Sequence, residues 1–222
     1  MKKSITQIIK NLINNIKSYA RFTSWVAFCL VLMTQNSQSF SITKENKKNL
    51  ELIESYLNNI KFLSANFIQE SPDGSVVEGL FYLSRPGKMR VEYVAQPKIL
   101  IIVNGSVLSY IDTELDETSH LRTNTTPASF LTRNKISFNA KDVEVTNIIN
   151  SNELITVSIV KKNRKEAGEF ALTFSKRPFK FIKMEVTNEL EEKTSIAFTK
   201  TNFTKKLPNN LFFTKKDEDE LY

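Results

Sequence analysis

The segment GLFYLSRPGKMRVEY, residues 79–93, has the pattern of two β-strands joined by a tight turn. Its corner is Arg85-Pro86-Gly87, and Pro-Gly is a common turn dipeptide. On the second strand, three apolar residues alternate with charged ones: Met89, Val91 and Tyr93. Because successive side chains of a strand point to opposite faces, we predict that these three point inward.

Similar strand-like runs, separated by turn residues, continue on both sides of this hairpin. They lie at residues 64–70, 76–84, 88–94, 98–103, 107–112, 142–149, 153–161, 169–175, 179–187, 194–201 and 211–214. Asn104-Gly105, between two of them, is typical of a two-residue hairpin turn. Strands and helices do not alternate along the chain. The pattern therefore predicts a mainly β (α+β) protein with one large antiparallel sheet, curled into a barrel or half-barrel within a single domain at residues 40–222.

Two segments are candidate covers for this sheet. Residues 43–60 place Leu50, Ile53 and Leu57 on one stripe of a helix that Ser41 or Thr43 can cap. In the segment TTPASFL, residues 125–131, Pro127 suits a first helical turn, and Phe130 and Leu131 follow it. Several strands, such as KILIIV at residues 98–103, are apolar on both faces, so both sides of the sheet need covering or one side lines a dry cavity. We expect covers on one face over an incompletely filled concave side.

The N-terminal segment has the features of a secretory signal peptide. It is basic, carries no acidic residue before Glu45, and contains the apolar run WVAFCLVLM at residues 25–33 followed by TQNSQS. This run is shorter than the roughly 20 residues that a membrane-spanning helix needs. We predict a signal peptide at residues 1–39 with cleavage after Ser39, and therefore an exported protein. An uncleaved N-terminal anchor is the alternative.

Removal of residues 1–39 takes away five positive charges and no negative ones, which lowers the net charge from +7 to +2. A nearly neutral chain has no global field that would attract nucleic acid, so we expect no nucleic-acid partner. The same cleavage removes Cys29, the single cysteine. The mature chain would then have no thiol for a disulfide or a zinc site.

Residues typical of catalysis are scarce. His120 is the single histidine and lies in a polar segment, 113–125, that we predict to be a solvated loop. The chain has no Gly-x-Ser-x-Gly nucleophile motif and no glycine loop of the phosphate-binding type. We therefore expect no catalytic residue, no metal site and no cofactor, and predict a binding protein rather than an enzyme.

The order of these motifs resembles the LolA family of periplasmic carriers that take lipoproteins to the outer membrane. The resemblance lies in SANFIQES, in LFYLSRPGKMRVEYVAQPKILIIVNGSVLSYID and in TTPASFLTRN, and extends over residues 50–213. It implies an unclosed antiparallel β-barrel of about eleven strands, with short helices as a lid over its mouth. It also implies that the concave interior binds the acyl chains of triacylated lipoproteins.

The resemblance assigns a role to the hairpin corner as well. In the family, an arginine that matches Arg85 holds the lid closed through hydrogen bonds to lid backbone, so Arg85 is the predicted lid latch. A guanidinium has five donors in a fixed fork, which suits several carbonyls at once. The alternative is that Arg85 is a solvated turn residue.

The remaining predicted site residues form two groups, for which ordinary core packing is the alternative. The acyl-chain cavity is predicted to be lined by Phe81, Leu83, Met89, Val91, Tyr93, Leu100 and Ile102. The lid is predicted to use Leu50, Ile53, Leu57, Pro127, Phe130 and Leu131. The partners that the resemblance implies are an inner-membrane lipoprotein-releasing ABC transporter and, in some bacteria, an outer-membrane lipoprotein receptor. We expect a monomer.

Two other functions are compatible with the residues. One is a periplasmic module with the same half-barrel that senses lipids or envelope stress, because fold does not fix function. The other is a secreted hydrolase, which the lack of a nucleophile and base pair disfavours. Since the chain continues only briefly after the last predicted strand, we expect the carrier rather than the sensor.

Overall fold

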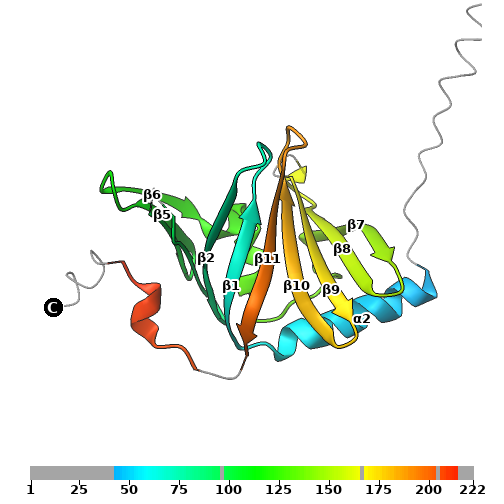
Figure 1. Cartoon of the computed structure of the whole chain (residues 1–222). Coiled ribbons are helices and arrows are strands. Elements are labelled where there is room, and N and C mark those ends of the chain that lie inside the picture. The colour runs from blue at the N-terminus through cyan, green and yellow to red at the C-terminus, as the bar shows by residue number, and fades with distance from the viewer. Residues whose placement is uncertain (1–42, 96–97, 166–167, 204–205, 215–222) are drawn as a thin grey trace, which may run out of the picture. The chain divides into compact units, whose positions relative to one another are not determined.

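The computed structural model describes residues 43–95, 98–165, 168–203 and 206–214 (Figure 1). The predicted signal peptide and Cys29 lie outside the described residues. Helix α2, Lys44–Asn59, is capped by Thr43, whose Oγ1 accepts a hydrogen bond from the N–H of Asn46 at 3.1 Å. No helix of the described ranges is both long and apolar enough to cross a membrane.

Eleven strands form one antiparallel sheet in the order β6-β5-β4-β3-β2-β1-β11-β10-β9-β8-β7. Their bounds are β1 Phe62–Glu70, β2 Val76–Ser84, β3 Lys88–Tyr93, β4 Ile99–Asn104, β5 Val107–Asp112, β6 Glu117–Arg122, β7 Val143–Asn150, β8 Leu154–Lys161, β9 Glu169–Lys176, β10 Phe179–Thr187 and β11 Lys193–Asn202. The 3₁₀ turn η1, Thr123–Thr125, and the short helix α3, Ala128–Thr132, connect β6 to β7. β6 and β7 end the sheet without pairing with each other, which confirms the predicted unclosed antiparallel fold.

The sequence predicted eleven strands and the structure has eleven, but one strand was missed and one was predicted where the chain forms none. The segment 113–125, predicted to be a loop, contains β6, so His120 lies on an edge strand and not in a loop. Every residue of β6 is exposed, and a strand that is polar on both faces has no alternation to reveal it. Residues 211–214, predicted to be a strand, are not one: Leu211 and Phe212 belong to the 3₁₀ turn η3, Asn209–Phe212.

Strand register shows which side chains share a face. Val91 of β3 pairs with Phe81 of β2 and with Ile101 of β4, and all three belong to or pack against the main core. Leu100 pairs with Glu92 and Ile102 pairs with Arg90, so they lie on the opposite face. The prediction that Leu100 and Ile102 line the cavity is therefore wrong. In β4 the concave-face residues are Ile101 and Val103.

The concave face is covered by α2 and by the segment around α3. Leu50, Ile53 and Leu57 of α2 are buried in one core cluster with side chains of both halves of the sheet. Near its start, α2 meets β7, where Asn150 Nδ2 donates to Glu45 Oε1 at 2.8 Å. Farther along, Tyr56 packs edge-on against Phe174 of β9.

These covers leave little empty space beneath them. The void lined by Leu57, Leu83, Leu131 and their neighbours measures about 10 Å³, close to the volume that a single water needs. The expectation of an incompletely filled concave side does not hold at this place, where the end of α2, α3 and the β1–β2 pair meet. Side chains of the lid itself occupy the space, as they do in an ordinary core.

The outer face of β3 and β4 has a cover of its own, formed by residues 206–214. Arg90 Nη1 donates to the carbonyl of Leu211 at 3.1 Å, and Lys88 Nζ donates to Asn209 Oδ1 at 3.1 Å. Phe212 of η3 is almost fully buried there. This cover explains why Ile102, on the outer face, is buried without contributing to the concave side.

Gly79 makes room for an aromatic contact inside the sheet. A Cβ at Gly79 would lie 2.3 Å from Phe67 Cζ and 2.4 Å from the carbonyl oxygen of Glu92. The space allows the Phe67 ring to pack edge-on against Tyr93, with ring centroids 5.3 Å apart.

We predict that Gly79→Ala lowers the free energy of unfolding by about 1–3 kcal/mol, because the carbonyl of Glu92 is backbone and cannot move away. Urea denaturation of the purified protein measures the change. Val76→Ala on the same strand is the control, since Val76 is 62% exposed and we expect a change below about 0.5 kcal/mol. An equal loss in both variants would contradict the steric account.

Candidate functional site

The hairpin corner at residues 85–87 contacts both parts of the lid. Arg85 Nε donates to the carbonyl of Ile60 at 2.9 Å, and Arg85 Nη2 donates to the carbonyl of Leu57. These carbonyls belong to the last turn and C-cap of α2, where no N–H four residues further along a helix pairs with them, and the Leu57 carbonyl also accepts from the N–H of Ile60 at 3.2 Å. A cation at a helix C-terminus also interacts favourably with the helix dipole.

Gly87 holds the second part of the lid. Its N–H donates to the carbonyl of Thr132, the last residue of α3, at 2.7 Å. The Gly87 φ of +81° is a conformation that glycine adopts without strain. In turn, the Gly87 carbonyl accepts from the N–H of Gly105 in the next hairpin turn at 2.8 Å. A single turn therefore fixes α2 through a side chain and α3 through its backbone.

The Arg85 guanidinium is not fully satisfied in this position. Its Nη1 is buried and has no hydrogen-bond partner among the described residues. Burial also lowers the pKa of Arg85 below its ordinary value, although the side chain stays protonated at neutral pH. Two charge-assisted bonds contribute about 1.5–3 kcal/mol each, while a stranded donor costs about 1–3 kcal/mol. The stranded donor therefore lowers the net stabilisation of the closed lid below the sum of the two bonds.

Polar residues on α2 clip it to the segment that follows α3. The Asn58 side chain accepts from the N–H of Ile136 at 2.8 Å and donates to the Ile136 carbonyl at 2.9 Å. Glu54 Oε1 accepts from Ser137 Oγ at 3.1 Å and from the N–H of Phe138 at 2.5 Å. These contacts make α2 and residues 136–138 one mechanical unit. The sequence prediction missed them, although the four-residue spacing of Glu54 and Asn58 on one helix face was a signal.

Tyr56 joins this unit to the sheet. Its hydroxyl oxygen accepts from the N–H of Phe181 at 3.2 Å, and its ring packs edge-on against Phe179 with centroids 5.2 Å apart. Burial raises the pKa of Tyr56, and the bond from Phe181 opposes that effect only in part. The Tyr56 hydroxyl therefore stays neutral to a higher pH than an ordinary tyrosine hydroxyl.

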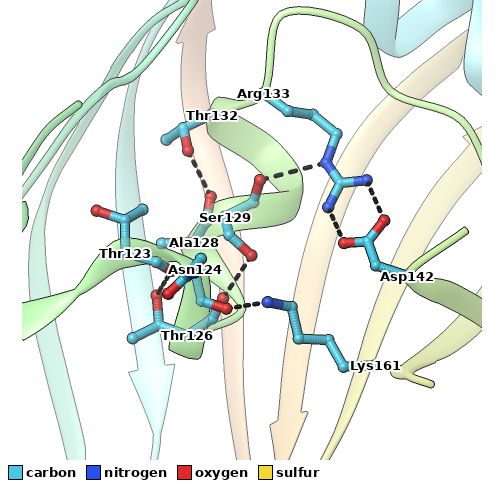
Figure 2. A network of polar contacts seen from close by, with 9 residues as sticks. All are labelled: Thr123, Asn124, Thr126, Ala128, Ser129, Thr132, Arg133, Asp142 and Lys161. Carbon is cyan, nitrogen blue, oxygen red and sulfur yellow. Dashed lines mark hydrogen bonds and ion pairs between the residues drawn. The ribbon is translucent and has the colours of Figure 1, made fainter. Parts of the chain in front are cut away.

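The short helix α3 is fastened to the β7–β8 edge of the sheet by charged groups (Figure 2). Arg133 forms an ion pair with Asp142, with Nη2 and Oδ2 3.0 Å apart, and its guanidinium carbon lies 5.1 Å from the centroid of the Phe130 ring. Lys161 Nζ donates to the carbonyl of Asn124 in η1. Sequence patterns provided no indication of these contacts, which join residues far apart in the chain.

Most of the predicted cavity and lid residues meet in one cluster. Phe81, Leu83, Met89, Val91, Phe130 and Leu131 are buried together with the three leucine and isoleucine residues of α2, and Tyr93 packs against them. Pro127 precedes α3 and is half-buried at its start. Leu100 and Ile102 are not brought to this cluster. The use of the cluster for acyl chains remains a prediction.

Part of the concave face extends beyond the lid. Register places Leu121 of β6 opposite Leu108, and Tyr110 opposite Ile101, on the same face as the core. Leu121 is 52% exposed and Tyr110 is 43% exposed. This apolar strip continues the concave face toward the edge strand and borders an open groove between β6 and α3 of about 780 Å³.

The described residues contain no cluster of three or more side chains that could hold a metal ion. His120 Nδ1 lies 3.0 Å from Ser109 Oγ across β5 and β6. Among the described residues, no carboxylate is hydrogen-bonded to the imidazole, so the pair lacks the orienting acid of a catalytic triad. We interpret it as a cross-strand contact on the outer face.

The sequence matches the family model described as outer membrane lipoprotein carrier protein LolA over residues 58–215. The chain belongs to the LolA family. It is 28% identical over 170 residues to an outer-membrane lipoprotein carrier protein of Coxiella burnetii (strain CbuK_Q154), which covers 70% of this chain and 77% of that relative. This finding confirms the resemblance drawn from the hairpin and lid motifs.

Solved structures with a similar fold include more distant proteins. A LolA-superfamily protein of Nitrosomonas europaea has 10% identity and a TM-score of 0.43, covering 75% of this chain and 98% of that chain. An uncharacterized conserved protein of Thermus thermophilus has 11% identity and a TM-score of 0.47, covering 78% of this chain and 96% of that chain.

We predict that Arg85→Leu increases the opening of the last turn of α2, because two hydrogen bonds to the carbonyls of Leu57 and Ile60 are lost. Hydrogen exchange followed by mass spectrometry should show protection of residues 54–62 falling about tenfold. Arg177→Leu is the matched control: it removes the same charge from another Arg-Pro hairpin, at a side chain that is exposed. Unchanged protection in the Arg85 variant would exclude a role in holding α2.

The Arg133–Asp142 pair predicts that acid weakens the attachment of α3 to the sheet. Burial raises the pKa of Asp142, but the hydrogen bond and charge of Arg133 outweigh it and hold the pKa below its ordinary value of 3.8. The stabilisation is therefore present above about pH 4 and is lost as pH falls through the lowered pKa. We expect Asp142→Asn at neutral pH to expose α3 to exchange as acid exposes it in the wild type. Glu144→Gln, on the neighbouring exposed pair with Lys165, should have no such effect.

Proposed function

We propose that this LolA-family protein carries lipoproteins through the periplasm by binding their acyl chains on the concave face of its sheet. The main structural support is the nature of the cover: two lid segments, α2 and α3, lie over an apolar face, and both accept hydrogen bonds from one hairpin corner. A cover of this kind can be displaced by a ligand that offers the sheet an equivalent apolar surface.

The cargo explains why such a face is needed. Moving an acyl chain from a bilayer into water costs about 0.8 kcal/mol per methylene, or on the order of 12 kcal/mol for one long chain. Three chains on one lipoprotein would cost roughly 35 kcal/mol. A dry concave surface offsets this cost, and the lid protects the same surface when no cargo is bound.

The partners of the carrier follow from that energetics. Release of a triacylated lipoprotein from the inner membrane needs an outside energy source, which we propose is an inner-membrane lipoprotein-releasing ABC transporter. Delivery ends at the outer membrane, at a lipoprotein receptor where the cell has one. We propose that the carrier works as a monomer, is exported by residues 1–39 and performs no catalysis.

Arg85 is the proposed latch between the empty and loaded states. It favours closure by bonding Leu57 and Ile60, and its stranded Nη1 reduces that preference. Acyl chains that occupy the concave face would separate Arg85 from α2, and cargo release would allow the bonds to form again. The latch would therefore drive unloading as much as closure.

Expression of the full-length chain in a Gram-negative host tests the proposal. Protein purified from the periplasmic fraction should carry triacylated lipoprotein in native mass spectrometry. We expect Arg85→Leu to retain lipoprotein about tenfold or more longer than the wild type when outer-membrane vesicles are added, since the closed state loses its bonds. Arg177→Leu should release cargo normally. Absence of lipoprotein from both the wild type and the Arg85 variant would contradict the carrier role.

A further inference from the structure

The sheet ends in two edge strands, β6 and β7, which the chain protects differently (Figure 1). β7 carries a bulge where its register with β8 shifts between Val145 and Asn147, and its last residue, Asn150, is bonded to Glu45 of α2. Bulges and covering elements are common means of blocking an edge strand from pairing with another chain. β6 pairs with β5 in an unshifted register over its whole length, Glu117–Arg122, and every residue in it is exposed.

One hydrogen bond beside β6 fixes which of its backbone groups face away from the sheet. The N–H of Thr123 donates to the carbonyl of Ser106 at 2.8 Å, and these two residues continue the register of β5 and β6. In an antiparallel pair, every second residue exchanges hydrogen bonds with the partner strand, and the residues between them point the other way. Counting back from Thr123, the N–H groups of Thr118, His120 and Arg122 therefore point away from β5.

The neighbouring strands give the same assignment. The N–H of Thr113 donates to the carbonyl of Lys98 at 3.2 Å, which assigns the odd-numbered residues of β5 to bonds with β4. The even-numbered residues are then left for β6, as the first bond requires. His120 and Ser109 are opposite each other, and their side chains are 3.0 Å apart at Nδ1 and Oγ. Such closeness is typical of opposed residues that do not exchange backbone bonds.

These outward groups form a ladder with no strand beside it. Among the described strands, β6 pairs with β5 alone. The Arg122 carbonyl accepts from Thr125 Oγ1 at 2.8 Å, which leaves the carbonyls of Thr118 and His120 and the outward N–H groups for a partner. An extended peptide matches this ladder, because its own N–H and C=O groups alternate at the same spacing.

The groove of about 780 Å³ lies beside the same end of β6. His120 and Arg122 line it on the strand side, and Ser129 and Arg133 line it on the side of α3. A peptide seated there would lie between the edge of the sheet and the lid.

The open edge also meets the apolar face that we propose for acyl chains. Leu121 belongs to that face, while its neighbours His120 and Arg122 direct N–H groups outward. A triacylated lipoprotein has the matching combination, since its acyl chains are carried on its first residue and polypeptide follows directly. This continuity selects the cargo as the source of the peptide.

We propose that β6 binds the polypeptide that follows the acylated residue of the cargo, as a strand added to the edge of the sheet. The proposal rests on the proposed carrier function and names a second part of the cargo that is recognised. Backbone pairing reads no side chains, so it suits a carrier of lipoproteins with different sequences. It excludes proline at the paired positions of the cargo.

Release of two synthetic probes tests the pairing. The first is a triacylated cysteine amide, and the second is the same cysteine followed by eight uncharged residues without proline. Each is loaded onto the full-length protein purified from the periplasmic fraction, and its release to added phospholipid vesicles is timed. We expect the wild type to retain the peptide probe about tenfold longer, because backbone hydrogen bonds add to the acyl contacts.

His120→Pro removes one outward N–H, and edge strands accept proline where the missing N–H faces away from the sheet. It should lose most of the tenfold difference and retain the amide probe like the wild type. His120→Ala is the matched control, since it removes the same imidazole contact with Ser109 but keeps the N–H. It should keep the full difference. Equal retention of the peptide probe by the two variants would overturn the proposal.

Hydrogen exchange followed residue by residue with NMR tests the wild type without any variant. Exchange of the amides of Thr118, His120 and Arg122 should slow about tenfold with the peptide probe and stay unchanged with the amide probe. Slowing with both probes would assign the effect to acyl chains and overturn the pairing. Slowing that grows with protein concentration in the absence of a probe would indicate pairing with a second copy of the chain, which would also overturn it.

The two probes separate this proposal from the carrier role. If the wild type retains both probes equally, the carrier role stands and the pairing at β6 fails. If the wild type retains neither probe, the concave face does not bind acyl chains, and the carrier role fails together with the pairing that rests on it.

Discussion

An apolar concave face that must always be covered governs this structure. The sheet directs Phe81, Val91 and Phe174, with their neighbours, to one side, and that side is too apolar to face water. α2 and α3 cover it in the closed state, and the filled space beneath them shows that lid and sheet pack as one core. A ligand can bind there only by replacing lid side chains with apolar surface of its own. Cargo and lid are therefore competitors for the same surface.

The balance of that competition depends on how the lid is held. Apolar packing favours the closed state, but the directional contacts converge on few groups: the corner at residues 85–87, the Tyr56 hydroxyl, and the Arg133–Asp142 pair. The Arg85 contacts include both two favourable bonds and a stranded donor. A latch that combined several fully satisfied bonds would hold too firmly to be opened by acyl chains. A partly satisfied one suits repeated loading and release.

The sequence predicted this arrangement where alternation was clear. In β3, apolar and charged residues alternate, so the inward face of Met89 and Val91 followed directly, and both are buried in the core. In β4, the run ILIIV is apolar at every position, so the sequence does not show which residues face inward. The pairing of β4 with Arg90 and Glu92 of β3 was needed to show that Leu100 and Ile102 face outward. β6 was missed because an exposed edge strand needs no apolar side. Phe212 and Phe213 resembled part of a strand because they are apolar. They belong instead to the segment that covers the outer face of β3 and β4, and no sequence pattern indicated that cover.

The contacts of the lid show a second limit of sequence patterns. The partners of Arg85 are carbonyls, which every residue has, so side-chain identity cannot indicate them, and only the family resemblance pointed to lid backbone. Arg133 and Asp142 are nine residues apart, and Lys161 reaches Asn124 across 37 positions. In the sequence, charged residues that only face solvent cannot be told apart from these. The three-dimensional arrangement was needed to show that these groups fasten α3.

The two lid segments are unequal, and this inequality indicates where opening begins. α2 is a 16-residue helix that buries three large aliphatic side chains and is clipped through Glu54 and Asn58. α3 has five residues, is too short to be stable alone, and buries Phe130 and Leu131 as its large side chains. Each such side chain contributes about 1.5–3 kcal/mol on burial, so separating α3 from the sheet costs less than separating α2. On the other side of the sheet, residues 206–214 cover β3 and β4, so β3, the strand that follows Arg85, is also held by contacts that do not involve the lid. Opening would therefore start between α3 and β9, where Phe130 leaves Phe170 and where Lys161 and Arg133 line a small cavity.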